Sequence, residues 1–283
     1  MQNDIKKLKF IAKIRLTLLY IIISIAAIVV LIPFYWMLLT AVKSDLAMQK
    51  IPPELFTLDI HLNNFLRAFK QAPFVLYFRN TLIVAFFSTI GTVTTTILAA
   101  FAFARLHFKG KDFLFTILLG TMMIPGEMLV ITNFVTVSRL GWIDTFPALI
   151  VPFMTSVFYV FFLRQTFMQI PNELYLAAKV DGTSDFKYLL RVMIPVGRPT
   201  IITITILSAL GSWNAYVWPS LVTNSNARRL VTNGLMSAFT DEFGSLQNLQ
   251  MAASAIVTLP ILIVFFLLKK QIMRGVSRSG IKG

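Results

Sequence analysis

The sequence contains no cysteine, only two histidines and few charged residues. Without cysteine it can form no disulfide, no thiolate nucleophile and no cysteine-ligated metal site. His61 and His107 lie far apart in the sequence, so we expect no histidine-rich metal centre. Charged residues make up 13% of the 283 residues, whereas soluble domains have about 25%. The shortage of charge indicates that much of the protein surface faces lipid.

Long apolar segments make up most of the chain, and 57% of its residues are hydrophobic. A helix that crosses the hydrocarbon core of a bilayer needs about 20 mainly apolar residues. We therefore predict an all-α integral membrane protein with six transmembrane helices. The predicted helices cover residues 16–41, 80–105, 113–137, 147–169, 199–221 and 248–269. Pro125-Gly126-Glu127 interrupts the third of them and Trp213-Asn214 the fifth. The first apolar run is too long for the core of a signal peptide, so we expect it to be a retained anchor.

The basic residues are distributed unequally between the two sides of these helices. If the N-terminus is cytoplasmic, that side holds five lysines and arginines before the first helix and three after the second. It also holds five between the fourth and fifth helices and five after the sixth, so that 18 of the 26 lie there. The positive-inside rule then predicts that both termini are cytoplasmic. We interpret the basic residues as contacts with lipid headgroups and expect no nucleic-acid partner.

Three regions follow from this orientation. They are a cytoplasmic N-terminus at 1–15, a six-helix permease domain at 16–269 and a cytoplasmic tail at 270–283. Within the permease domain, the segment 171–198 is a hydrophilic cytoplasmic loop.

This loop begins with PNELYLAAKVDGTSDFKYLLRVMIP, residues 171–195, which predicts two short helices. Pro171 and Asn172 favour a helix start, and residues 173–181 suit a first helix. Gly182 fits the left-handed position that commonly closes a helix. A second helix is expected to begin after Thr183 or Ser184 and to end at a proline, Pro195.

One face of the first predicted helix carries two adjacent alanines. The residues at helical spacing on this face are Leu174, Ala177, Ala178 and Asp181. Small side chains would let another protein approach the backbone closely, whereas a helix that binds only lipid favours large apolar anchors. We interpret the segment as a docking element for a protein, with a plain amphipathic loop as the alternative.

The same segment is similar to the signature loop of ATP-binding-cassette (ABC) importer permeases. In that family the pattern runs E-A-A, three residues, G, nine residues, I-x-L-P. The matching positions are Ala177, Ala178, Gly182 and Pro195. Leu176 stands where the family has glutamate, so an ion pair made by that carboxylate would be missing here. Val192 and Ile194 are conservative replacements.

Four further segments resemble the carbohydrate importers of the maltose type, specifically their six-span permease subunit. They are MIPGEMLV (123–130), LGWIDTFPALIVP (140–152), GSWNAYVWP (211–219) and GVSRSGIKG (275–283). The resemblance covers the chain from about residue 75 onwards. It implies a type I ABC importer permease fold and the function of a binding-protein-dependent transport system inner membrane component.

In that family the loop is a coupling helix that sits in a cleft of a cytoplasmic ATPase. The residues that the resemblance assigns to this contact are Leu174, Ala177, Ala178, Asp181, Gly182 and Pro195. It also implies that the tail reaches between the ATPase subunits with Gly280, Ile281, Lys282 and Gly283. The chain has no phosphate-binding loop of the G-x-x-x-x-G-K-[ST] type. We therefore expect a non-catalytic subunit without a cofactor, whose partner ATPase binds ATP and Mg²⁺.

Further partners follow from the resemblance alone. They are a second permease subunit, expected to be distinct, a dimer of the ATPase and an extracytoplasmic sugar-binding protein. The loops 42–79 and 222–247 are expected to meet the binding protein.

Polar residues within predicted spans are candidates for the substrate pathway, because polar groups at membrane depth favour a bundle interior or a water-filled cavity. The candidates are Ser212, Trp213, Asn214, Tyr216, Glu127 and Asn133. Aromatic rings beside amides suit sugars. Alternatively, Trp213 belongs to an interfacial aromatic belt, and Ser212 and Asn214 bond a neighbouring helix.

Three other functions are alternatives to carbohydrate import. An ABC importer for a non-sugar solute would share the docking loop. An ion-coupled carrier would need more charges at mid-membrane depth than Glu127 provides. A membrane enzyme that acts on lipid-linked sugars would need clustered acids or a metal site, whereas the 12 acidic residues here are scattered.

Overall fold

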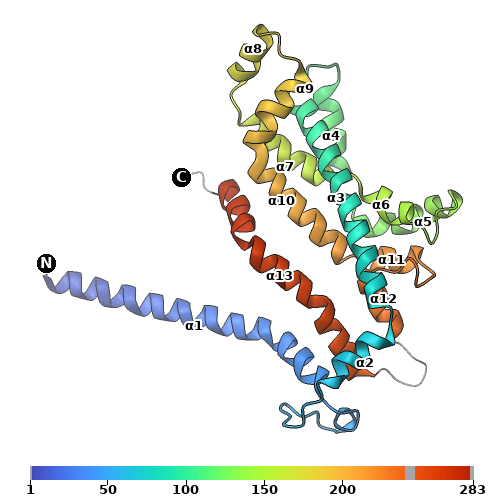
Figure 1. Cartoon of the computed structure of the whole chain (residues 1–283). Helices are drawn as coiled ribbons and strands as arrows, with labels where there is room; N and C mark the ends of the chain where they lie inside the picture. The colour runs from blue at the N-terminus through green and yellow to red at the C-terminus, as the bar shows by residue number, and fades with distance from the viewer. Residues whose placement is uncertain (1, 240–245, 281–283) are drawn as a thin grey trace. The chain divides into compact units, whose positions relative to one another are not determined.

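The computed structural model describes residues 2–239 and 246–280, and throughout these residues the chain forms helices joined by turns and loops (Figure 1). The chain divides into two compact units. Unit 1 consists of Met1–Gln71 and Phe239–Ile256, and unit 2 of Ala72–Ala238 and Val257–Gly283. Helix α13 (Gln247–Gly280) contributes residues to both.

Four helical stretches in the described residues are long and apolar enough to cross a membrane. They are Phe10–Ala41, Phe74–Arg105, Asp185–Trp213 and Gln247–Lys269. Two bent pairs of helices also qualify, namely Lys111–Thr121 with Gly126–Arg139, and Phe146–Phe153 with Val157–Met168. If each bent pair counts as one span, the described chain has six, as the sequence predicts.

The third span, predicted at 113–137, is broken at Pro125-Gly126-Glu127, and this confirms the interruption that the sequence predicts there. Helix α4 (Lys111–Thr121) ends early, and a 3₁₀ turn, η2 (Gly126–Leu129), leads into α5 (Val130–Arg139). The segment Gly126–Arg139 is bent by 88° relative to α4. Pro125 precedes the turn with an extended ψ of 131°. It has no backbone N–H to donate and disfavours a helical conformation in the residue before it, which favours a break at this point.

The fourth span is also bent, by 41°. It consists of α6 (Phe146–Ile150), the 3₁₀ turn η3 (Val151–Phe153) and α7 (Val157–Met168). Two hydroxyls of α3 (Phe74–Arg105) bond the carbonyls that the break leaves free. Thr92 Oγ1 donates to Phe153 O and Thr95 Oγ1 to Met154 O, both at 2.7 Å. The break is therefore stabilised from a neighbouring helix, as broken membrane helices require.

The fifth span begins earlier than predicted and does not stop at Pro195. Helix α9 (Asp185–Tyr188), the π-helical turn η4 (Leu189–Met193) and α10 (Ile194–Trp213) follow one another without a break. The prediction that Pro195 ends the helix is wrong. Proline is tolerated there because it lies in the first turn of α10, directly after a π-helical turn has changed the hydrogen-bond register. The predicted interruption at Trp213-Asn214 is confirmed, since α11 (Val217–Val222) is a separate helix.

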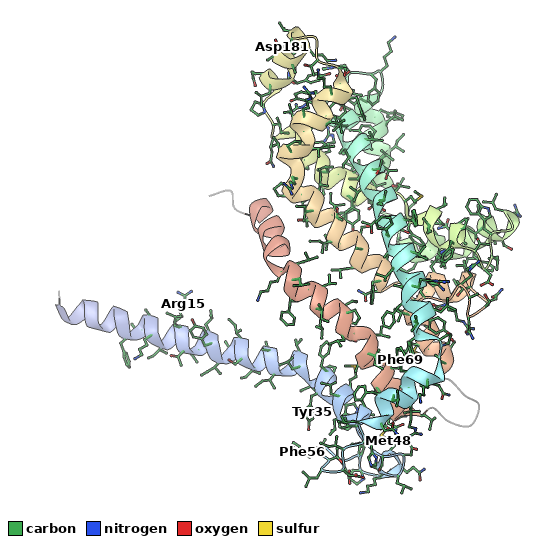
Figure 2. The ribbon with its side chains drawn as sticks, viewed as in Figure 1. Arg15, Tyr35, Met48, Phe56, Phe69 and Asp181 are labelled. Carbon is green, nitrogen blue, oxygen red and sulfur yellow. The ribbon has the colours of Figure 1, made fainter. Side chains whose placement is uncertain are left out.

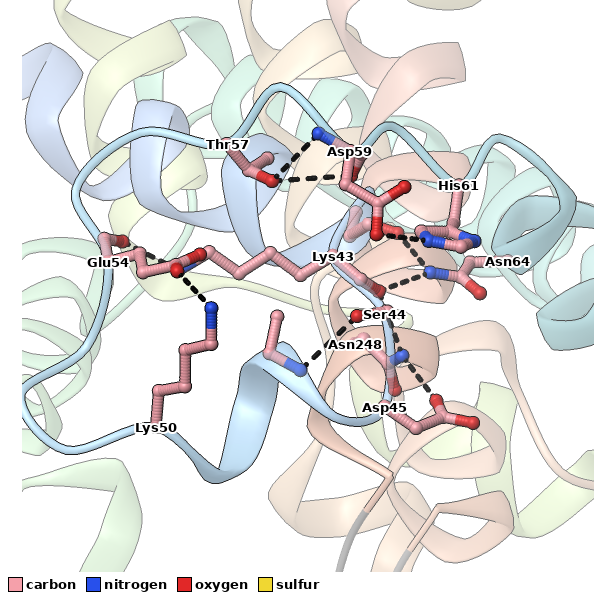
Figure 3. A network of polar contacts seen from close by, with 12 residues as sticks. Lys43, Ser44, Asp45, Lys50, Glu54, Thr57, Asp59, His61, Asn64 and Asn248 are labelled. Carbon is pink, nitrogen blue, oxygen red and sulfur yellow. Dashed lines mark hydrogen bonds and ion pairs between the residues drawn. The ribbon is translucent and has the colours of Figure 1, made fainter.

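Unit 1 holds the loop after α1 (Gln2–Ala41) in place with polar contacts (Figure 3). Asn64 of α2 (Asn63–Gln71) donates to the carbonyls of Ala41 and Lys43 at 3.0 and 2.8 Å. Asn248 donates to Lys43 O at 3.1 Å and to Asp45 Oδ1 at 2.6 Å. Two buried amides therefore fix the loop at its beginning. This loop also contains a short 3₁₀ turn, η1 (Ala47–Gln49).

The far part of this loop returns to α1. Lys43 is buried, and its Nζ donates to Glu54 O at 2.6 Å. Tyr35 donates to Leu55 O at 2.6 Å, and its ring lies 6.4 Å from that of Phe56 (Figure 2). The loop is therefore a packed structure, although it has little regular secondary structure of its own.

Unit 2 is built around α3, which packs along both α7 and α10. One core cluster lies towards its C-terminal end and includes Phe101, Leu163 and Tyr188. A second cluster contains Val84, Leu149 and Trp218. Helix α12 (Val231–Ala238) packs near the beginning of α3, where a Cβ on Gly234 would come within 2.4 Å of the Tyr77 ring. Glycine is therefore needed for this close approach.

Candidate docking helix and translocation cavity

The hydrophilic segment that follows α7 forms a short helix with a sharp end. Helix α8 (Asn172–Val180) follows Pro171, and Gly182 adopts a φ of 68°. Thr183 N donates to Ala178 O at 2.9 Å, and Gly182 N donates to Lys179 O at 3.0 Å. These two bonds form a Schellman motif, which needs a left-handed residue at the glycine position. The predicted helix, its closing glycine and the cap at Ser184 are all present, since Ser184 Oγ accepts from Lys187 N at 3.4 Å.

Most of the predicted docking residues are exposed on α8 and on the turn after it. Leu174, Ala177, Asp181 and Gly182 are exposed, and Asp181 is labelled in Figure 2. Ala178 differs from them: it is half-buried, because it packs against the core cluster that contains Tyr175 and Tyr188. Pro195 lies apart from this face in sequence and structure, in the first turn of α10. Leu176, at the position of the family's glutamate, is 54% exposed.

The buried side of α8 is attached to α9 through Asp185. Tyr175 donates to Asp185 Oδ1 at 2.6 Å, and Lys179 Nζ lies 2.6 Å from the same oxygen. The hydrogen bond to Asp185 raises the pKa of Lys179 above its usual value. The Tyr175 ring also meets the Tyr188 ring edge-on, with centroids 5.1 Å apart. Displacement of α8 would therefore be transmitted to the start of the fifth span.

A buried arginine attaches the other end of this segment. Arg105, the last residue of α3, is only 7% exposed. Its Nη2 donates to Phe167 O at 2.8 Å and also to Ile170 O. Carbonyls at a helix C-terminus carry partial negative charge, so a buried cation is well placed there. Arg105 therefore holds the end of α7 directly before α8 begins.

A cavity of about 310 Å³ lies inside unit 2, midway along α3. Its walls come from α3, the break before α7, α10 and α11. The lining residues with hydroxyls are Ser88, Thr92, Thr155, Ser156, Tyr159, Ser208 and Ser212. The remaining lining residues are apolar, among them Phe153 and Trp218. A concave site with a mainly apolar lining and a few polar groups is typical of small-molecule binding.

The structure brings only one predicted pathway residue, Ser212, into the lining of this cavity. Asn214 and Tyr216 are exposed in the connection between α10 and α11. Trp213 packs against Phe78, with ring centroids 5.9 Å apart.

The two remaining pathway candidates lie elsewhere. Glu127 of η2 and Asn133 of α5 are exposed and do not line the cavity. Of the predicted tail contacts, Gly280 ends α13, whereas Ile281, Lys282 and Gly283 lie outside the described residues, as do residues 240–245 of the loop at 222–247.

Sequence reasoning missed the hydroxyl residues of α3. Ser88, Thr92 and Thr96 occur at intervals of four and are all buried. A hydroxyl stripe in an otherwise apolar span faces other helices or a cavity, so the helical spacing could have identified these residues. Among residues 2–239 and 246–280, no group of three or more His, Cys, Asp or Glu side chains could hold a metal ion.

Near the beginning of α3, Asp144 joins two loops. Its carboxylate accepts hydrogen bonds from Asn224 N at 3.0 Å, Ser225 N at 3.1 Å and Ser225 Oγ at 2.6 Å. Desolvation opposes ionisation, but these bonds outweigh it and lower the pKa of Asp144 below its usual value. Asp144 has a φ of 60°, a left-handed value that aspartate tolerates better than most residues.

Comparisons with known proteins agree with this architecture. Residues 93–278 match the family described as binding-protein-dependent transport system inner membrane component. The lactose transport system permease protein LacG of Rhizobium radiobacter is 31% identical over 265 residues, which cover 92% of this chain and 94% of LacG. The arabinooligosaccharides transport system permease protein AraQ of Bacillus subtilis is 28% identical over 279 residues, 96% of each chain.

A solved structure shows the same fold. It is the crystal structure of a bacterial ABC transporter involved in the import of the acidic polysaccharide alginate, with a TM-score of 0.78 and 22% identity. The similarity covers 89% of this chain and 94% of that one. The fold and the family match thus define a membrane-embedded permease of the type I ABC importer class. The chain belongs to the family of binding-protein-dependent transport system inner membrane components. It is a non-catalytic subunit, and ATP hydrolysis belongs to a partner ATPase.

Proposed function

We propose that this chain forms half of the translocation pathway of an ATP-driven importer, whose cargo is a carbohydrate delivered by an extracytoplasmic binding protein. The observation that carries the proposal is the exposed α8 with its Gly182 turn, in a chain that matches the family over residues 93–278. The names of LacG and AraQ, which denote lactose and arabinooligosaccharide transport, support a carbohydrate cargo.

In this proposal α8 sits in a cleft of the cytoplasmic ATPase and moves when the ATPase dimer closes. Leu174, Ala177, Asp181 and Gly182 make the contact, and the half-buried Ala178 supports them from behind. The tail from Gly280 to Gly283 reaches between the two ATPase subunits. Tyr175, Lys179 and Asp185 then transmit the movement of α8 to the fifth span.

The proposed orientation places both termini and α8 in the cytoplasm. It is supported by 18 of the 26 lysines and arginines, which fall on that side of the spans. A second, distinct permease completes the pathway, and the loops 42–79 and 222–247 meet the binding protein. A packed loop at residues 42–62 suits this role, because its exposed side chains are held in defined positions.

Reconstitution tests the proposal directly. The chain is assembled in proteoliposomes with the second permease and the ATPase, and the binding protein is added outside with radiolabelled neutral sugars. We expect sugar uptake that requires ATP on the side of the ATPase and that stops without the binding protein. Uptake driven by a proton or sodium gradient without ATP would contradict the proposal. If the transporter takes up only non-sugar solutes with ATP, the chain is still part of an ATP-driven importer, but the proposed carbohydrate cargo is wrong.

A further inference from the structure

The cavity inside unit 2 contains a buried hydroxyl without a partner. Ser88 is 1% exposed and lines the cavity. Its Oγ has no hydrogen-bond partner among the described residues. Thr92, one turn further along α3, differs because its hydroxyl already donates to Phe153 O. A buried polar group without a partner costs free energy, and most such groups in proteins are bonded to protein, water or ligand. The Ser88 hydroxyl is therefore available to bond an occupant of the cavity.

The lining defines the chemistry of that occupant. None of the described residues around the cavity is charged. Ser88 on α3 and Ser208 and Ser212 on α10 offer hydroxyls that can donate or accept. Rings of Phe153, Tyr159 and Trp218 add apolar walls. This combination favours a neutral ligand with several hydroxyls and apolar ring faces, and it disfavours a carboxylate, for which no cation is present.

The volume limits the size of the occupant. A cavity of about 310 Å³ is at the lower end of the range for small-molecule sites, about 300–1,000 Å³. It suits one sugar ring rather than an oligosaccharide. Water alone could also satisfy Ser88, and the experiment must distinguish the two.

We propose that this cavity binds one neutral sugar ring of the cargo, with Ser88 and Ser212 hydrogen-bonded to its hydroxyls and Trp218 and Tyr159 against its faces. The inference rests on the proposed carbohydrate function and adds a contact site within this chain itself. It also adds a selectivity, because the site accepts a neutral ring and rejects a uronate.

Cysteine protection tests the site without knowledge of the natural cargo. The native chain has no cysteine, so Ser212→Cys introduces a single thiol into it. The complete transporter in nanodiscs is treated with N-ethylmaleimide, and labelling of this chain is measured by mass spectrometry. The probes are methyl glucoside, methyl galactoside and methyl mannoside, with galacturonate as the anionic probe. Ser138→Cys, on the exposed side of α5, is the control.

We expect at least one neutral glycoside to slow labelling of Ser212→Cys, galacturonate to have little effect, and no probe to slow labelling of Ser138→Cys. Adding Ser88→Ala to Ser212→Cys should raise the glycoside concentration for half-protection by about 3- to 10-fold, the effect of one lost hydrogen bond. If Ser88 is only structural, removal of its unpartnered hydroxyl will leave that concentration unchanged. Protection by no neutral glycoside, equal protection by galacturonate, or no labelling of Ser212→Cys at all would overturn the proposal.

A cavity-filling variant gives an independent test in transport. No described heavy atom lies within 4 Å of the position that a Cβ would take at Gly211, which lines the cavity. Gly211→Leu should therefore add a bulky side chain to the cavity wall without displacing the backbone, and reduce sugar uptake about tenfold or more because it clashes with a bound ring. Gly120→Leu on α4 is the matched control, because its added side chain also meets open space.

The two proposals fail in different ways. If the wild-type transporter imports sugar but Gly211→Leu transports as well as Gly120→Leu, only the cavity inference is wrong. If the wild-type transporter imports no sugar with its binding protein, the carbohydrate function itself is wrong.

Discussion

Single polar side chains hold the loops and helix ends of this protein together. Arg105 and Asp144 are charged, and each bonds more than one backbone group. Charged hydrogen bonds of this kind stabilise more than neutral ones. Each joins segments that lie more than 60 residues apart in the sequence, since Arg105 bonds Phe167 and Asp144 bonds Ser225. Their effect can be measured one residue at a time.

The contribution of Asp144 should depend on pH in a predictable direction. A carboxylate whose pKa is lowered in the folded state stabilises the fold above its usual value of 3.8, and this stabilisation is lost as the pH falls through the lower folded-state pKa. At pH 7, Asp144→Asn should lower the free energy of unfolding by about 1–2 kcal/mol, since a charged acceptor is replaced by a neutral one. Asp144→Ala should cost more, because alanine also tolerates a φ of 60° less well.

Thermal unfolding of the purified transporter at pH 7 and near pH 3 measures both effects. The difference between wild type and Asp144→Asn should shrink at the lower pH. Asp112→Asn, at an exposed carboxylate, is the control and should change little at pH 7. An equal difference between wild type and Asp144→Asn at both pH values would show that the charge of Asp144 is not responsible.

At the scale of elements, the segment from α8 to α10 links an exposed helix to a membrane span. Its Schellman turn requires the left-handed Gly182, and the Tyr175–Asp185 bond attaches α8 to the helix that follows. Ala178 is less suitable for a test of docking than Gly182, because it packs against the core cluster. A change at Ala178, such as Ala178→Glu, would therefore disturb folding as well as any contact with a partner.

Gly182→Trp should uncouple the transporter. Glycine is exposed there, so a large side chain would disrupt docking, and we expect ATP-driven uptake to fall about tenfold or more, within the usual range of coupling energies. Gly110→Trp is a matched control, because Gly110 is also exposed and has a similar φ of 78°. Both variants place a bulky residue at a similar left-handed φ.

Uptake and ATP hydrolysis are measured on both variants, with the amount of assembled complex quantified for each. Loss of uptake in Gly182→Trp, with near-normal uptake in Gly110→Trp, would support docking at α8. Normal uptake in Gly182→Trp would remove the proposed role of this turn.

At the scale of the whole molecule, the length of α3 can be compared with the thickness of a membrane. Its 32 residues correspond to about 48 Å, more than the roughly 30 Å thickness of the hydrocarbon core. Tyr77 and Thr81 near its beginning bond the segment 226–231, while Arg105 at its end holds the segment before α8. The two contacts therefore lie at opposite ends of a membrane-spanning helix. We infer that α8 and the loop 222–231 face opposite sides of the bilayer.

Labelling with a membrane-impermeant maleimide tests this orientation. Lys187→Cys lies next to α8, and Lys50→Cys lies in the loop after α1; both side chains are exposed, and the native chain contributes no background thiol. In intact cells we expect Lys50→Cys to be labelled, whereas Lys187→Cys should react only after the membrane has been permeabilised. Labelling of Lys187→Cys in intact cells would contradict both the orientation and the docking of α8 to a cytoplasmic ATPase.

Much of the fold could be predicted because each helix that crosses the lipid must be long and mainly apolar. Long apolar runs, their number and the distribution of lysines and arginines are all visible without a structure. Helix α8 could also be predicted, since its start and its closing glycine are local features, while its docking role stays a prediction. The interruption at Pro125 was visible in the sequence. The bend before Ser156 was not predicted, because it is stabilised by hydroxyls from another helix, such as that of Thr92.

The sequence alone predicted a membrane permease with a short exposed helix between its fourth and fifth spans, because hydrophobic length and helix capping act over short distances along the chain. Only the tertiary structure decided where the fifth span begins, which residue holds α7 against α3, and which hydroxyls surround a cavity. Those features depend on side chains such as Ser88 and Ser212, which are distant in sequence and meet only when the helices pack against one another.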